Sequence, residues 1–311
     1  MTQTTIGIDI SKAHLDAHDL NTGTHARFDN SADGLCALKR WLGPTPPDRV
    51  VFEPTGPYHR RFETTFSGHL PLVKVNPLQA RRFAQAHGAR AKTDAVDARM
   101  LAVMGRALEL VPDRPVDHKE RELKELHICR AGLVRDRTAL INRLATQTLG
   151  LTRRLTRARL AQAERQIAKL DAEIEARNRL CPRRSRNLDI LTSIPGIGAI
   201  TARTLLGNCP EIGTLPAKQV AALAGLAPMT RESGQWRGKA RIQGGRRHLR
   251  EALFMPALVA MKRNPDLSAK YDALRAAGKP HKVALTVLMR KLIILANTLL
   301  KENRLWQPKS A

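Results

Sequence analysis

The hydrophobic and polar positions of the first 112 residues change repeatedly between the period of a strand and that of a helix. In TTIGIDIS, Ile6, Ile8 and Ile10 occupy every second position, which is typical of a strand with one buried face. AHLDAHDL and THARFDN follow after short turns and predict a tight antiparallel meander. Four helical segments and two strands follow, in the order SADGLCALKRWLG, RVVFEPTG, PYHRRFETTFSGHL, PLVKVNP, PLQARRFAQAHG and KTDAVDARMLAVMGRALEL. We therefore expect an α/β region with a mixed sheet flanked by helices at residues 1–112.

The rest of the chain has mainly helical periodicity. Residues 113–184 predict two long antiparallel helices with a break near Gly150 and Thr152. This pair is either a coiled coil that joins two copies of the chain or a simple hairpin spacer. Residues 185–311 predict a helical domain with glycine-rich turns. We thus expect three parts, with the helical linker between the α/β region and the helical C-terminal domain.

Charge narrows the class of partner. The chain of 311 residues has 53 Lys and Arg against 28 Asp and Glu, a formal net charge of +25. Such an excess attracts polyanions, and nucleic acid is the commonest one. Aromatic residues make up 4%, so base stacking is not expected to dominate binding. Because we find no signal peptide, no apolar run near 18 residues and no cysteine spacing of a zinc or redox site, we expect a soluble cytoplasmic protein without a membrane partner.

Four acids stand out in this basic chain. Asp9 lies within a strand, where aspartate is disfavoured, on the face opposite the isoleucines. Glu53 ends an apolar strand, and strand ends often hold the chemistry of α/β sheets. Asp94 and Asp97 share one face of a helix, although after a capping Thr93 they also simply suit the helix dipole.

The expected sheet order brings these acids together. With the first strand central and the fourth beside it, Asp9 and Glu53 become neighbours, and the later helix can carry Asp94 and Asp97 across them. Carboxylates gathered in a nucleic-acid-binding protein suggest hard divalent cations, Mg²⁺ or Mn²⁺, as the ligand. Two such ions would support phosphoryl transfer.

The C-terminal region contains two further candidate sites. The turn at Gly196 and Gly198, between two helices, resembles a helix-hairpin-helix whose amides hold a DNA phosphate, or else contains ordinary packing glycines. Ser233 precedes Gly234 in an exposed context, as a simple turn or as a nucleophile with only His248 as a candidate base. The expected nucleic-acid contacts are Arg237, Lys239, Arg241, Arg246, Arg247 and Arg250 here, with Arg153 and Arg154 in an acid-free stretch of the long helices.

Together, GIDISK, FEPTGPY, AKTDAVDARMLA, SIPGIGAITA, LAGLAP and SGQWRGKARIQGG resemble, in this order, the DEDD-type transposases of bacterial insertion sequences. The group is the one numbered one hundred and ten, related to the Piv-type DNA invertases. The resemblance implies a RuvC-like (RNase H-like) domain, a coiled-coil linker and a transposase domain. It also implies that Asp9, Glu53, Asp94 and Asp97 bind the metal and that Ser233 forms a transient phosphoserine link to DNA. Relatives usually have Lys-Gly where this chain has IQGG, from which we expect a changed polar contact only.

We therefore expect a recombinase that moves its own insertion sequence with Mg²⁺ or Mn²⁺. The resemblance adds a structured guide RNA to donor and target DNA as partners, and work on two duplexes suggests a homodimer that assembles to a tetramer. Three alternatives remain open: a metal-dependent nuclease similar to Holliday-junction resolvases, a site-specific DNA invertase, and a non-catalytic basic protein that bridges DNA.

Overall fold

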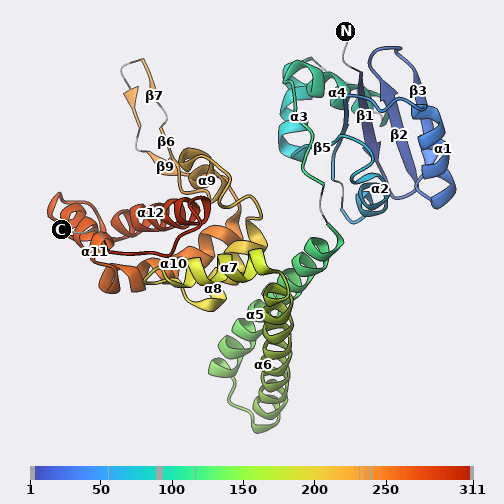
Figure 1. Cartoon of the computed structure of the whole chain (residues 1–311). Coiled ribbons are helices and arrows are strands. Elements are labelled where there is room, and N and C mark those ends of the chain that lie inside the picture. The colour runs from blue at the N-terminus through green and yellow to red at the C-terminus, as the bar shows by residue number, and fades with distance from the viewer. Residues whose placement is uncertain are drawn as a thin grey trace. The chain divides into compact units, whose positions relative to one another are not determined.

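The computed structural model describes residues 4–54, 56–88, 94–115, 117–230, 232–234, 236–238 and 240–308. The chain divides into two compact units, residues 1–118 and 119–311. The first unit contains the α/β region, and the second contains the long helices and the helical C-terminal region (Figure 1). The chain is therefore of the mixed α/β type that the sequence predicts.

A five-stranded mixed sheet with the order β3-β2-β1-β4-β5 organises the first unit (Figure 1). Its strands are β1 (Thr5–Ile10), β2 (His14–Asp19), β3 (His25–Asp29), β4 (Arg49–Phe52) and β5 (Leu72–Lys74). The first three strands pair antiparallel, and β4 runs parallel to both β1 and β5. The predicted meander and the predicted neighbourhood of the first and fourth strands are both confirmed.

Helices cover both faces of this sheet. On one face, Ile6, Ile8 and Ile10 pack in a core with side chains of α1 (Ala32–Leu42) and α2 (His59–Phe66). Ser31 caps α1 through its hydroxyl, and Gly43 ends the helix with φ of 77°, as the sequence predicts. The other face packs against α3 (Pro77–Ala86) and α4 (Asp94–Ala107) through a core that includes Val51, Val73, Leu101 and Met104.

Two long helices, α5 (His118–Thr146) and α6 (Gly150–Arg179), form an antiparallel hairpin (Figure 1). Arg130 and Asp171 join them by a pair of hydrogen bonds of 2.7 and 3.0 Å. The predicted break near Gly150 and Thr152 is wrong by a few residues, because Gly150 already begins α6. The break lies at residues 147–149, where the Arg153 guanidinium donates to the carbonyl groups of Leu144 and Gln147.

The helical body of the second unit is built around α12 (His281–Lys301). The surrounding helices are α7 (Pro182–Thr192), α8 (Ala199–Asn208), α9 (Ala217–Leu223), α10 (Arg247–Arg263) and α11 (Pro265–Ala276). Leu285, Leu288, Leu292 and Ile293 of α12 are buried in its core. The expectation that no segment approaches a membrane span needs correction, since α12 is long and apolar enough for one. Its apolar composition is explained by this burial, because a core helix meets the same criteria of length and composition.

The glycine-rich basic segment contains strands that the sequence did not predict. The described residues of this segment, within 228–242, form four strands of two residues each: β6 (Pro228–Met229), β7 (Glu232–Ser233), β8 (Trp236–Arg237) and β9 (Arg241–Ile242). β6 pairs with β9 and β7 pairs with β8, so the segment folds back on itself as an arm (Figure 1). Two-residue strands are too short to show an alternating pattern, so the prediction of turns between helices missed them.

Candidate active site and nucleic-acid interface

Gly7 lets α4 lie directly on β1. A Cβ atom at this position would lie 2.0 Å from the Ala98 carbonyl oxygen and 2.5 Å from the Ala102 nitrogen. Gly7 and Asp9 are two residues apart on one strand, so they face the same side of the sheet. The helix that begins with Asp94 therefore covers the face of the sheet that contains Asp9.

Asp9 is the centre of the predicted acidic set. Its carboxylate is half-buried and accepts a hydrogen bond of 3.0 Å from the Ile10 amide. Burial, and then the charges of Asp97, Asp94 and Glu53, together raise the pKa of Asp9 to about 6. The structure thus brings Asp97, Asp94 and Glu53 within electrostatic range of Asp9, at the edge where the parallel strands β1 and β4 end.

These carboxylates suit a hard divalent cation in their chemistry. Carboxylate oxygens are the ligands that such ions prefer, and a cation beside Asp9 would offset the burial and the neighbouring charges that raise its pKa. Within the described ranges, however, no three His, Cys, Asp or Glu side chains are arranged closely enough to hold a metal ion. Asp9 therefore has other carboxylates near it, but these side chains do not yet form a complete set of metal ligands.

Two residues that the sequence analysis did not single out complete this face. Asp16 on β2 lies directly opposite Asp9 in the strand register, and Arg27 on β3 lies directly opposite Asp16. Arg27 donates two hydrogen bonds to Asp16, of 3.0 and 3.1 Å, and one of 2.8 Å to Oδ2 of Asp94. Asp16, like Asp9, is an acid within a strand, where aspartate is disfavoured, and this signal is visible in the sequence.

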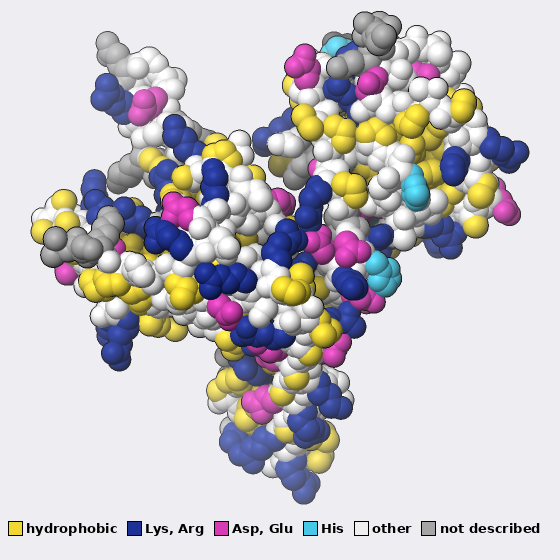
Figure 2. All heavy atoms as spheres, viewed as in Figure 1, with side chains coloured by type: hydrophobic (Ala, Val, Ile, Leu, Met, Phe, Trp, Pro, Cys, Tyr) yellow, Lys and Arg dark blue, Asp and Glu magenta, His cyan; other side chains and the backbone are white. Residues whose placement is uncertain are grey.

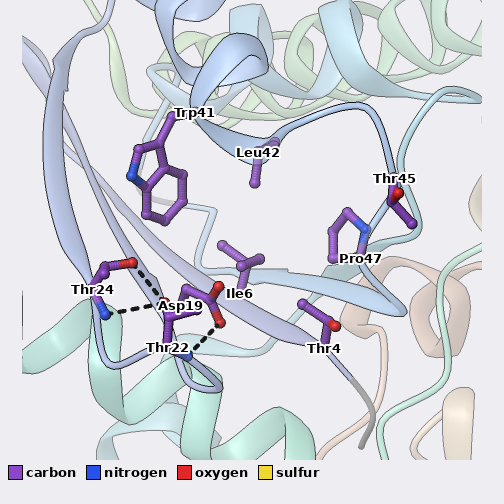
Figure 3. Close-up of a pocket in the computed structure, with 9 residues that line it drawn as sticks. All are labelled: Thr4, Ile6, Asp19, Thr22, Thr24, Trp41, Leu42, Thr45 and Pro47. Carbon is purple, nitrogen blue, oxygen red and sulfur yellow. Dashed lines mark hydrogen bonds between the residues drawn. The ribbon is translucent and has the colours of Figure 1, made fainter. Parts of the chain in front are cut away.

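A shallow pocket in the first unit lies away from these acids. It has a volume of about 210 Å³, and the residues that line it are Thr4, Ile6, Asp19, Thr22, Thr24, Trp41, Leu42, Thr45 and Pro47 (Figure 3). Thr4 immediately precedes β1 and Ile6 is the second residue of this strand, whereas Asp9 lies near its end. The pocket therefore opens at the opposite edge of the sheet and includes none of the predicted catalytic residues.

Ser233 lies in the second unit, on the arm. It is exposed, ends β7, and pairs in register with the exposed Trp236 of β8. Gly234 follows with φ of 56°, a left-handed conformation that favours glycine. Ser233 is thus exposed, as a nucleophile should be. It also lies at a tight turn, as the interpretation of a simple Ser-Gly turn predicts.

The predicted basic contacts fall into two groups. Arg237 and Arg241 are exposed on the arm, and Arg247 is exposed at the start of α10, where it pairs with Glu251. Lys239 lies outside the described residues.

Two further arginines of this segment are used within the protein. Arg246 donates to both carboxylate oxygens of Glu211, at 2.8 and 2.7 Å, and to the Asn208 carbonyl. Arg250 donates to the Gly244 carbonyl at 2.9 Å. These bonds attach the base of the arm to the helical body.

The two glycines of the predicted helix-hairpin-helix have different surroundings. Gly196 has φ of 107°, and a Cβ atom there would lie 2.7 Å from the Pro256 carbonyl oxygen of α10. Its close approach is therefore made to the protein's own helix. Gly198 precedes α8 with open space around it, so its amide remains a candidate phosphate contact.

Basic residues gather at the free end of the α5–α6 hairpin (Figure 2). No acid occurs between residues 137 and 163. Arg154 is exposed there, whereas Arg153 is half-buried and holds the loop between the two helices. This end of the hairpin therefore has both a structural and a freely accessible arginine.

Comparison with known proteins gives consistent matches along the chain. Residues 6–153 match a family model described as a DEDD transposase of the IS110 type. Residues 188–272 match a second one, described as the transposase IS116/IS110/IS902 family. The two matches follow each other in the order that the sequence motifs predict.

Curated relatives fall into two kinds. Proteins named pilin gene-inverting protein, from Moraxella bovis and Moraxella lacunata, are each 29% identical over 316 residues, which cover 98% of this chain and 98% of the relative. An uncharacterized 43.6 kDa protein of insertion element IS110, from Streptomyces coelicolor, is 36% identical over 122 residues, 39% of this chain and 30% of the relative. The full-length similarity is thus to gene-inverting proteins, and the higher identity is to an insertion-element protein over a shorter stretch.

Proposed function

Because the chain belongs to the IS110 family of transposases, which cut and rejoin DNA, we propose that it moves its own insertion sequence with a metal ion and a serine nucleophile. One observation carries the proposal: Glu53, Asp94 and Asp97 converge electrostatically on Asp9 at one edge of the sheet. A strand order of 3-2-1-4-5 with an antiparallel meander supports an RNase H-like (RuvC-like) fold for this unit.

Asp9, Glu53, Asp94 and Asp97 would hold Mg²⁺ or Mn²⁺. When bound, the ion would stabilise the charge that develops on phosphate oxygens during strand cleavage. The raised pKa of Asp9 supports this assignment, because its burial and the three neighbouring carboxylates destabilise a charge that a cation would neutralise.

Ser233 would supply the nucleophile from the arm. Its hydroxyl oxygen forms a bond to phosphorus while the bond from phosphorus to a sugar oxygen breaks, and the serine proton leaves with that sugar oxygen. The resulting phosphoserine link conserves the energy of the phosphodiester for rejoining. The exposure of Ser233 and the arginines beside it, Arg237 and Arg241, support this role, because they can approach a phosphate together with the serine.

Nucleic-acid partners follow from the charge. A formal net charge of +25 suits a protein that holds donor and target DNA, and it also suits the structured guide RNA that we propose as a further partner. The free end of the α5–α6 hairpin and the arm are the proposed contact surfaces (Figure 2).

The α5–α6 hairpin is the proposed dimer element, within a division of the chain at residues 112 and 184. Large apolar side chains are exposed along it: Ile128, Ile141, Leu149, Leu151 and Leu155. Burial of these side chains against a second copy would stabilise a homodimer, and two dimers would form the tetramer that two DNA duplexes require.

Covalent trapping tests the mechanism. We would incubate the full chain with DNA of the element's ends, the adjacent RNA and Mg²⁺, and separate the products on denaturing gels. We expect a protein–DNA adduct that disappears with Ser233→Ala and falls on the order of 1000-fold with Asp9→Asn, since loss of metal stabilisation costs several kcal/mol. Ser268→Ala, in α11, is the matched control and should leave the adduct unchanged.

The same gels test the alternatives. Cleaved DNA without an adduct, lost with Asp9→Asn but retained with Ser233→Ala, would establish a metal-dependent nuclease instead. DNA binding without cleavage, unchanged in both variants, would establish a bridging protein.

Site-specific inversion is a second candidate function. The observation in its favour is the full-length similarity to the two Moraxella gene-inverting proteins. A plasmid with two inverted recognition sites distinguishes the two activities, because an invertase reverses the intervening DNA whereas a transposase inserts the element at a new target.

A further inference from the structure

Asp9, Asp16 and Arg27 form one row across the three antiparallel strands. Each residue is the register partner of the next, so the three side chains share the face that α4 covers. The first residue of α4, Asp94, meets this row at Arg27. The row therefore connects the strand that contains one proposed metal ligand to the helix that contains two.

Arg27 is fixed by a buried anchor. The Asp16 carboxylate is only 2% exposed, and it accepts two parallel bonds from the guanidinium, with His25 Nε2 at 3.2 Å as a further partner. A bidentate pair of this kind sets the plane of the guanidinium. An ordinary exposed ion pair contributes little, because both side chains lose freedom when it forms. Here the guanidinium is already held by Asp16 when it meets Asp94.

We propose that Arg27 is a positioning residue for the metal site. It holds the Asp94 carboxylate through Oδ2, at 2.8 Å, and leaves Oδ1 for a divalent cation, while Asp16 acts as the anchor. Carboxylates that bind metals are themselves commonly held by hydrogen bonds from a second layer of residues. The inference rests on the proposed metal-binding function of the four acids.

The direction in which the affinity for a cation changes distinguishes a positioning role of Arg27 from a simple effect of its charge. Loss of the positive Arg27 alone would strengthen cation binding if only charge mattered, whereas loss of the clamp would weaken it. The double variant Arg27→Gln with Asp16→Asn removes one positive and one negative charge, so it leaves the net charge unchanged. It also avoids an unpaired buried carboxylate, which would destabilise the fold.

The test uses Mn²⁺ binding to the full chain, followed by the electron paramagnetic resonance signal of the free ion. We expect the double variant to bind Mn²⁺ about 10- to 100-fold more weakly than the wild type, the usual effect of losing such a second-layer contact. Arg27→Lys keeps the charge but cannot bond both carboxylates in the same way, so we expect an intermediate affinity. Arg40→Gln on α1, which packs on the opposite face of the sheet, is the matched control and should bind as the wild type does.

Circular dichroism of each variant shows that the fold is retained. Unchanged or tighter Mn²⁺ binding by the folded double variant would overturn the role of Arg27 and leave the proposed function intact. If the wild type binds no Mn²⁺, or if Asp9→Asn binds it equally well, the metal site itself is wrong and both proposals fall.

Discussion

The acidic edge of the sheet and the basic arm are organised in opposite ways. Asp9 is half-buried, lies on a strand with neighbours on both sides, and is covered by a helix that Gly7 admits. Ser233 is exposed on a strand of two residues, and all the described residues of β6 to β9 are exposed as well. Asp9 is thus placed by the core of the fold, whereas the side-chain bonds of Arg246 and Arg250 fix the base of the arm.

This difference indicates what determines the geometry of each region. Burial and register set the acidic edge before any ligand binds, which favours precise placement of charges. We expect the arm to take its working geometry from the nucleic acid that it contacts, because few internal contacts restrain it. Substitutions in the two regions should therefore fail in different ways.

Gly7→Ala should produce the largest effect. The new methyl group would lie 2.0 Å from a backbone oxygen of α4, so the helix must move away from β1. We expect a loss of about 1 to 3 kcal/mol in unfolding free energy, as for other overpacked sites. Strand cleavage should fall by about 100-fold or more, since an error of about 1 Å in placing Asp94 and Asp97 is costly. Urea unfolding and the trapping assay measure the two effects.

Gly132→Ala is the matched control for that change. Gly132 lies within α5 with open space around it, so the same methyl group meets no neighbour. Helix propensity predicts a gain of up to about 1 kcal/mol. Equal losses in both variants would show that the approach of α4 to β1 is not what places the acids.

The pH dependence of stability should reveal a buried histidine of the second unit. Burial, and then the charges of Arg130 and Arg203, together lower the pKa of His127 to about 4. Between pH 4 and 6.5 the unfolded chain then binds a proton that the folded chain does not. Unfolding free energy should therefore rise with pH across this window, by about 3 kcal/mol at most. His127→Gln should flatten that slope in urea titrations at several pH values.

Asp9 should change the unfolding free energy with pH in the direction opposite to His127. Its pKa is raised to about 6, chiefly by burial, so the folded chain keeps a proton that the unfolded chain loses. Its contribution to stability decreases as pH rises from about 4 to 6. Asp9→Asn should therefore make the pH slope in this window steeper, and a flatter slope would contradict the assignment.

Arg246 and Arg241 should give the smallest and most specific contrast. Arg246→Gln breaks the pair with Glu211, and we expect a loss of about 1 to 2 kcal/mol in unfolding free energy. Arg241→Gln should leave stability unchanged, weaken DNA binding, and reduce the slope of log affinity against log salt by about 1. Fluorescence anisotropy with labelled DNA at several salt concentrations measures this slope. A stability loss in Arg241→Gln would show that the arm is held more firmly than its exposure indicates.

The sequence predicted the first unit well because its signals are local. Alternating isoleucines, the Ser31 cap and Gly43 marked elements whose order then determined the sheet. The break between the long helices was misplaced because a side chain from the next helix, Arg153, holds it. No local sequence pattern indicates that contact. The strands of the arm are too short to show an alternating pattern of hydrophobic and polar residues.

Only those residues of the candidate site were predicted whose position in the sequence is unusual by itself. Asp9 and Glu53 were found from their positions in strands, and the strand order that makes them neighbours is confirmed. Arg27 was missed because an arginine in an edge strand is unremarkable by itself. Its significance depends on the strand register with Asp16 and on the place where α4 begins, which only tertiary structure supplies.

The apolar helix α12 also has a consequence for biosynthesis. The arm emerges from the ribosome about 40 residues before α12 begins, so the helix that completes the core of the helical body is then still unmade. The first unit can fold as soon as residues 1–118 are free, since domains fold as units during synthesis. A gene interrupted before residue 281 would therefore yield a folded first unit attached to a helical region without its central helix. Such a product would retain the proposed metal ligands while its basic arm had no stable support.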